Sequence, residues 1–101
     1  MTPRRLTLRT AVASEARRLH ALIAANLEEG HLLPRTLGEI GAHADRFVIA
    51  VRGRRIVGCA ELAPLSPQLA EVRSLAVESA ERHRGIGTLL VSELRRRARS
   101  V

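Results

Sequence analysis

The stretch that decides the fold is EVRSLAVESAERHRGIGTLL, residues 71–90. Residues 69–77 alternate as a strand does, with two faces: Leu69, Glu71, Arg73, Leu75 and Val77 against Ala70, Val72, Ser74 and Ala76. A polar turn, residues 78–84, leads into Gly85-Ile86-Gly87. Beyond it the apolar residues follow helical spacing, at Ile86, Leu89, Leu90, Leu94, Ala98 and Val101. The stretch predicts a strand, a glycine turn and the start of a helix.

A turn of this kind is suited to binding an anion. The first backbone N–H groups of a helix have no partner within it, and the helix dipole favours negative charge there. Glycine lets the backbone approach a phosphate closely because it has no Cβ. Arg82 and Arg84 add guanidinium groups that can fork onto phosphate oxygens. The alternative is an ordinary tight turn before a surface helix.

The same residues carry a family resemblance. Arg82-x-x-Gly85-x-Gly87 resembles the (Q/R)-x-x-G-x-(G/A) acyl-CoA pyrophosphate loop of the GNAT N-acetyltransferases. RSLAV, residues 73–77, resembles that superfamily's fourth strand, whose backbone meets the pantetheine arm. LLPRT (32–36) and EVRSLAV (71–77) are similar to the N-acetylglutamate synthase-like subgroup, and the resemblance runs from residue 6 to residue 101.

The resemblance implies an acetyl-CoA-dependent enzyme that acetylates the amine of a small, acidic molecule such as glutamate. This would be a cytoplasmic role in amino-acid metabolism, specifically arginine biosynthesis. Acetyl transfer to an amine needs neither a metal nor a protein nucleophile. The residues implied to contact acetyl-CoA are Leu75, Ala76, Val77, Arg82, His83, Arg84, Gly85, Ile86, Gly87 and Thr88.

Three further residues are candidates for handling the acceptor. Glu71 is the candidate general base, because GNAT enzymes often place a glutamate on this strand. Arg35, before a predicted helix, and Arg73 are candidates for holding a substrate carboxylate. The alternatives are that Glu71 and Arg73 pair with each other or are solvated, and that Arg35 is an exposed arginine.

The other elements are predicted in chain order: a strand over 6–10, a helix from about 15 to 29, a short helix from 37 to about 43, a buried strand over 46–51, a turn at 52–54, a return strand over 55–62 and a proline loop over 63–68. Ser14 is the expected N-cap of the first helix and Gly30 its stop. Thr36-x-x-Glu39 matches a capping box for the second helix. Gly58 permits a bulge or close packing in the return strand.

The composition indicates the size of the domain and its core but excludes few functions. The 101 residues allow one domain with a modest core, and the only aromatic residue is Phe47. The net charge is +7 and all 17 basic residues are arginines, scattered except for the cluster at 95–99. Such charge suits nucleic acid, an anionic membrane or CoA, but the aromatic platforms of nucleic-acid binders are missing, so nucleic acid is an unlikely partner.

Two further features bear on location. No apolar run approaches the ~20 residues of a membrane span, so no membrane association is expected. The single Cys59 cannot form an internal disulfide, which agrees with a reducing, cytoplasmic compartment. Its position in a predicted strand favours a small buried residue over a nucleophile.

The expected fold is α/β with a mixed sheet, in the order strand, helix, helix, three strands and helix. A complete GNAT domain continues with another strand, a helix and usually two more strands, so residues 1–101 are expected to form a single, truncated N-acetyltransferase domain. Many members supply a tyrosine as general acid from that later part, and this sequence has no tyrosine. The chain is then part of a longer enzyme, one half of a pairing with a second chain, or a CoA-binding module without catalysis. An open sheet edge beside the fourth strand predicts self-association into a homo-oligomer.

Overall fold

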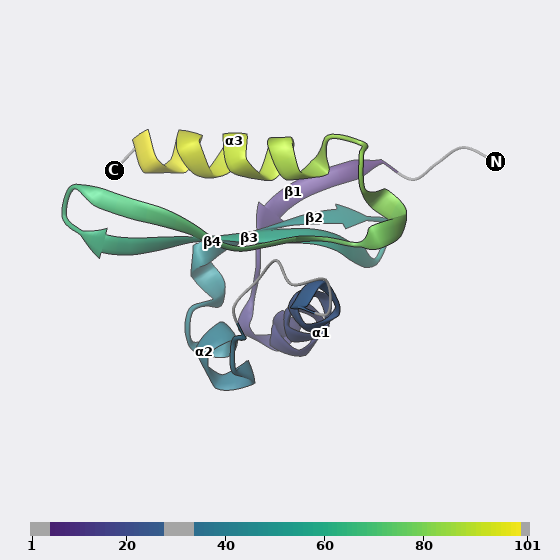
Figure 1. Ribbon diagram of the computed structural model, residues 1–101, viewed down its shortest axis with the longest axis horizontal. Coiled ribbons are helices and arrows are strands. Elements are labelled where there is room, and N and C mark those ends of the chain that lie inside the picture. The colour runs from purple at the N-terminus through teal and green to yellow at the C-terminus, as the bar shows by residue number, and fades with distance from the viewer. Residues whose placement is uncertain (1–4, 28–33, 100–101) are drawn as a thin grey trace.

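The computed structural model describes residues 5–27 and 34–99. Its elements are β1 (Leu6–Thr10), α1 (Ala16–Leu27), α2 (Leu37–Ala42), β2 (Phe47–Arg52), β3 (Arg55–Ser66), β4 (Leu69–Val77) and α3 (Ile86–Arg99), with short 3₁₀ turns at Ala13–Glu15, Ala44–Arg46 and Ser79–Glu81. Figure 1 shows one sheet with α3 on one face and both α1 and α2 on the other. The α/β class and the element order are confirmed. A mixed sheet was expected, and the pairings among the described strands, in the order β1-β2-β3-β4, are all antiparallel.

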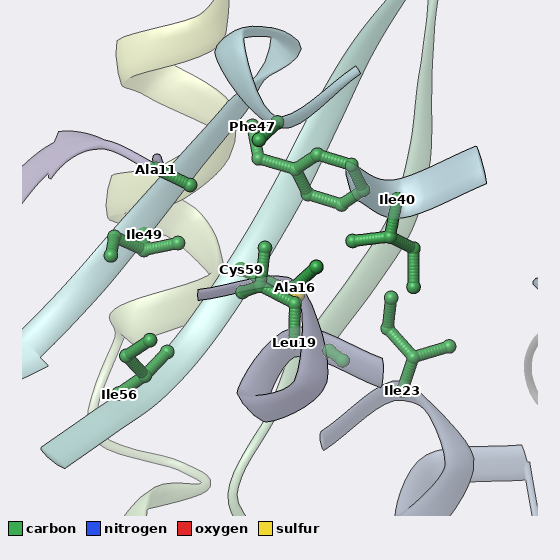
Figure 2. Close-up of a cluster of buried hydrophobic side chains, with 11 residues drawn as sticks. Ala11, Ala16, Leu19, Ile23, Ile40, Phe47, Ile49, Ile56 and Cys59 are labelled. Carbon is green, nitrogen blue, oxygen red and sulfur yellow. The ribbon is translucent and has the colours of Figure 1, made fainter. Parts of the chain in front are cut away.

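Strand β2 is buried on both faces, as its continuous apolar run predicts. Phe47 and Ile49 face α1 and α2, and Val48 and Ala50 face α3. The buried side chains form two cores, one on each face of the sheet. Figure 2 shows the first core, on the side of α1 and α2, in which Phe47 lies against Ile40 of α2. The first core consists of Ala11, Ala16, Leu19, Ile23, Ile40, Ala44, Phe47, Ile49, Ile56, Cys59 and Ala76, and the second of Val48, Ala50, Val57, Ala60, Ile86, Leu90 and Leu94.

The beginning of α3 is fixed by its approach to Gly58 on β3. A Cβ on Gly58 would lie 3.0 Å from Cγ2 of Ile86 and 3.1 Å from Cδ1 of Leu90. The strand also has an extra residue here, because the register with β2 shifts next to Gly58. Both predictions for Gly58, a bulge and close packing, are confirmed. The missing side chain lets α3 lie directly on the sheet and so fixes where the helix starts.

Gly58→Val is therefore expected to lower the free energy of unfolding by roughly 2 kcal/mol, because the added methyl groups overpack the α3 interface. Urea unfolding followed by circular dichroism measures the change. Gly41→Ala is the matched control, since its Cβ would meet only Cβ of Ala16, at 3.7 Å. A Gly58→Val variant as stable as the parent would show that α3 is not held at this contact.

Three local expectations are corrected. Ser14 lies inside the 3₁₀ turn Ala13–Glu15 and is not the N-cap of α1; the Glu15 carboxylate accepts the Val12 N–H at 3.0 Å instead. The expected loop from residue 63 is strand as far as Ser66, because β2 begins opposite Glu61 and leaves one side of β3 open beyond that residue, where a proline is tolerated. The regular alternation expected along β4 is interrupted between Arg73 and Ala76. The predicted cap at Thr36 is confirmed, since its hydroxyl accepts the Glu39 N–H at 3.1 Å, whereas the stop at Gly30 lies outside the described residues.

The thiol of Cys59 lies fully buried in the first core, and burial raises its pKa to about 12. An unfolded thiol titrates near pH 8.5, so the unfolded chain loses this proton at a lower pH than the folded chain. This contribution to stability is intact below about pH 8.5 and is lost as the pH rises toward 12. We expect the unfolding free energy of the parent to fall between pH 8 and 10 more steeply than that of Cys59→Ala. An equal dependence of unfolding free energy on pH in the two proteins would contradict burial of the thiol. Rapid reaction of the native protein with iodoacetamide at pH 8 would contradict it as well.

Candidate active site

The segment after β4 forms the predicted anion-binding turn. His83 and Gly85 have positive φ angles of 66° and 81°, which reverse the chain before α3. Glycine adopts this conformation without strain, which gives Gly85 a backbone role. The first recorded bond into the helix runs from the Leu89 N–H to the Gly85 carbonyl at 3.1 Å. The N–H groups of residues 86–88 precede it and have no helix carbonyl to bind.

The turn opens onto a pocket of about 340 Å³ lined by Val77, Glu81, Arg82, His83, Gly85, Ile86, Gly87 and Thr88. Apart from neighbouring residues of the turn and helix, nothing described lies within 4 Å of where a Cβ on Gly85 or Gly87 would stand. The backbone of the turn is therefore accessible to a ligand. Most of the residues that the sequence assigned to acetyl-CoA line this pocket, together with Glu81, which was not predicted.

The side chain of Arg82 is directed back into the protein. Its Nε donates to the Val77 carbonyl at 3.2 Å, and its Nη2 donates to Oδ1 of Asn26 at 3.0 Å. Asn26 is buried on α1, where its own amide donates to the Leu22 carbonyl at 2.9 Å. Arg82 thus holds the turn against the end of β4 and α1, whereas the Arg84 side chain is mostly exposed and approaches Glu81 at 3.9 Å.

Strand β4 contains a bulge that the sequence pattern did not reveal. Cys59 pairs with Ala76 and Glu61 with Arg73, so β4 has one residue more than β3 between these pairs. Ser74 lies there with a φ of 53°. Regular alternation of the odd-numbered residues along the whole strand is therefore wrong.

The bulge changes which face of the sheet the side chains of β4 occupy. Leu75 and Val77 turn to the α3 face, while Ala76 enters the core under α1 and α2. Glu71 and Arg73 precede the bulge and share a face, as predicted, because their partners Ala63 and Glu61 lie two residues apart on β3. No other strand pairs with the outer edge of β4 among the described residues.

A buried ion pair lies on the α2 side of this bulge. Arg35 donates from Nη1 to Oε1 of Glu61 at 2.6 Å and to Oγ of Ser74 at 2.9 Å, and its Nε donates to Glu39 at 3.2 Å. The side chains of Arg35 and Glu61 are only 12% and 1% exposed. Hydrogen bonding to Glu61 raises the pKa of Arg35, so the guanidinium is always charged. The signal for Glu61 was available, since it is a lone acidic residue in an otherwise apolar stretch of β3.

Glu71 and Arg73 pair with each other, Oε2 to Nε at 3.2 Å, as one of the alternatives expected. Both side chains are about half exposed, at 51% and 47%. Arg73 stands opposite Glu61 in the strand register, so β4 places Arg73 beside the carboxylate that holds Arg35. The fold thus brings the three acceptor candidates to one face of the sheet, next to the bulge.

Comparisons with known proteins agree with this geometry. The acetyltransferase (GNAT) family model matches residues 9–101. An uncharacterised N-acetyltransferase of Chlorobaculum tepidum is 34% identical over 86 residues, covering 85% of this chain and 56% of the relative. The chain thus spans little more than half the length of that curated relative.

Two solved structures show the same fold. N-acetylglutamate synthase of Neisseria gonorrhoeae, in complex with coenzyme A and N-acetyl-glutamate, is 27% identical with a TM-score of 0.88, over 95% of this chain and 23% of that one. A Mycobacterium tuberculosis protein in complex with CoA is also 27% identical, with a TM-score of 0.84, over 93% of this chain and 58% of that one. The fold, with its glycine turn before α3, is that of the acyl-CoA N-acyltransferases. The chain belongs to the GNAT acetyltransferase family.

In the part of the chain that the structure describes, no helix is both long and apolar enough to cross a membrane. Within the same residues, no group of three or more His, Cys, Asp or Glu side chains could hold a metal ion.

Proposed function

We propose that this chain binds acetyl-CoA and transfers the acetyl group to the amine of a small acidic molecule such as glutamate. The observation that carries the proposal is the open turn at the start of α3, with its accessible glycines and helix N–H groups, directly joined to a strand that bears the acceptor candidates. The resemblance to the N-acetylglutamate synthase-like subgroup and the CoA complexes of similar structures support it.

Each part of the cosubstrate has a proposed place. The diphosphate would bind the N–H groups of residues 86–88, with His83 and Arg84 at the rim. The pantetheine arm would follow the open edge of residues 75–77, whose outward backbone groups lack a strand partner among the described residues. Arg82 would act mainly by holding this turn against β4 and α1.

The acceptor would lie across β4 from the pantetheine. Glu71 would remove a proton from the ammonium, directly or through water, so that the amine attacks the thioester carbon. The C–N bond forms and the C–S bond breaks. CoA leaves as the thiolate, which takes up the second proton lost by the nitrogen, directly or through water. Arg73 and Arg35 would hold the carboxylate. Among the described residues, Arg35 donates through its Nε and Nη1 atoms. Its Nη2 atom would be available to donate to a substrate.

Thiol release from acetyl-CoA, measured with glutamate and with glutamine, tests the proposal. Glutamate is expected to react at least tenfold faster, because glutamine lacks the second carboxylate. Glu71→Gln is expected to lower kcat about a hundredfold without changing CoA affinity. Absence of acetylation by a chain that binds CoA would instead favour the alternatives, a CoA-binding module without catalysis or a part of an enzyme that requires a second chain.

We also propose that the chain, as a single domain, self-associates through the outer edge of β4, where Leu69 and Val72 are exposed. Sedimentation at micromolar concentration should show a dimer or larger species, and a clean monomer would contradict this. A cytoplasmic location and a role in arginine biosynthesis stay predictions.

A further inference from the structure

The pocket proposed to bind an anion also contains a carboxylate, which has the same sign of charge as the anion. Glu81 lines the same pocket as Gly85 and Gly87 and is only 8% exposed. A buried negative charge would repel a diphosphate bound at the turn, and this repulsion is stronger in a poorly solvated pocket than in water. The pocket can accept a diphosphate only if this charge is compensated.

Arg52, at the end of β2, supplies the compensation. Its Nε donates to Oε2 of Glu81 at 3.2 Å and its Nη2 donates to Oε1 at 3.1 Å, which is a two-pronged pair. The Arg52 side chain is 24% exposed, so the pair is largely shielded from solvent. Nη1 of Arg84 also lies 3.9 Å from Oε1 of Glu81. The Arg84 side chain is mostly exposed, so solvent screens this contact.

We infer that Arg52 is a positioning residue for the cosubstrate: it neutralises Glu81 and so lets the diphosphate of CoA bind at the turn. The inference rests on the proposed function, since it assigns the diphosphate to this pocket. Arg52 does not line the pocket, so it acts through Glu81. No sequence motif singles it out, because it precedes Glu81 by 29 residues and the sheet brings the two together.

The same hairpin contains a matched control. Arg55, at the start of β3, pairs with Glu78 at the other end of the 3₁₀ turn. The Arg55 side chain is mostly exposed, and neither Arg55 nor Glu78 lines the pocket. Both arginines tie the hairpin to the turn, but only Arg52 neutralises a carboxylate in the pocket. A purely structural role would be shared by the two arginines.

The experiment measures the dissociation constants of CoA and of pantetheine, which lacks the phosphates, by calorimetry for five proteins. These are the parent chain, Arg52→Gln, Glu81→Gln, the double variant Arg52→Gln/Glu81→Gln and Arg55→Gln. Arg52→Gln is expected to weaken CoA about tenfold and to leave pantetheine unchanged. The double variant should return to within about twofold of the parent, and Arg55→Gln should match the parent.

Glu81→Gln alone provides a test that does not require Arg52→Gln to fold. It leaves the positive charge of Arg52 near the diphosphate, so CoA should bind about threefold more tightly. Weaker CoA binding by Glu81→Gln would overturn the inference, as would a double variant no better than Arg52→Gln. If the parent binds no CoA, the proposed function and the inference both fall; if the parent binds and Arg52→Gln is unchanged, only the inference does.

Discussion

Gly87→Glu is expected to abolish CoA binding while making the protein more stable. Gly87 is the second residue of α3, and apart from neighbouring residues of the turn and helix nothing described lies within 4 Å of its Cβ position, so the fold has room for a side chain. Glutamate has the higher helix propensity, by roughly 0.5 kcal/mol, and its charge suits a helix N-terminus. The same carboxylate would enter the pocket proposed for the diphosphate. We expect at least a hundredfold loss of CoA affinity, about 2.7 kcal/mol.

Gly38→Glu is the matched control for this variant. Gly38 is also the second residue of a helix, α2, and apart from neighbouring residues of that helix nothing described lies within 4 Å of its Cβ position. The two substitutions change charge and helix propensity equally, so both should raise the melting temperature. Only Gly87→Glu should lose CoA binding, measured by calorimetry. Undiminished binding by Gly87→Glu would place the diphosphate elsewhere, and equal losses in both variants would show an effect of charge alone.

Arg35→Met is expected to lower the free energy of unfolding by about 3–5 kcal/mol. The change leaves the Glu61 carboxylate 1% exposed and without the guanidinium that it accepts from at 2.6 Å. Domains of this size are commonly stable by only about 5–15 kcal/mol, so the loss is a large fraction of the total. Urea unfolding of the variant, followed by circular dichroism, measures it.

The double variant Arg35→Met/Glu61→Leu separates charge from packing. Replacing both members of a buried pair by apolar residues restores most of the stability when the cost is an uncompensated charge. We expect the double variant to lie within about 1.5 kcal/mol of the parent. It should nevertheless lose the preference for an acidic acceptor, since one of its two proposed clamps is gone. A double variant as unstable as Arg35→Met would show that Arg35 acts through packing of its stem.

The sequence predicted the architecture well because the signals for it are local. Alternation in β4, the apolar run of β2 and the capping residue Thr36 each specify their own element. What local patterns could not show is where the chain brings distant residues together. The pairs Arg35–Glu61 and Arg52–Glu81 join residues 26 and 29 positions apart, and no periodicity reports them.

The errors have the same origin. The bulge at Ser74 depends on how β4 matches β3, and it turns Leu75 and Val77 to the opposite face from Arg73. The assignment of Arg82 to the phosphate stays a prediction, but the motif did not show that its side chain donates to Asn26 on α1, a contact that follows from the packing of α1 against the end of β4. The sequence placed Glu81 only within a polar turn, and the fold shows that it is buried and lines the pocket of the proposed anion site.

Binding of the CoA diphosphate at the turn before α3 is tested by a pair of calorimetric titrations of the unmodified chain, one with CoA and one with pantetheine. CoA is expected to bind at least a hundredfold more tightly, because only CoA has a diphosphate to reach the N–H groups of residues 86–88. Equal affinities, or no heat of binding with CoA, would contradict it.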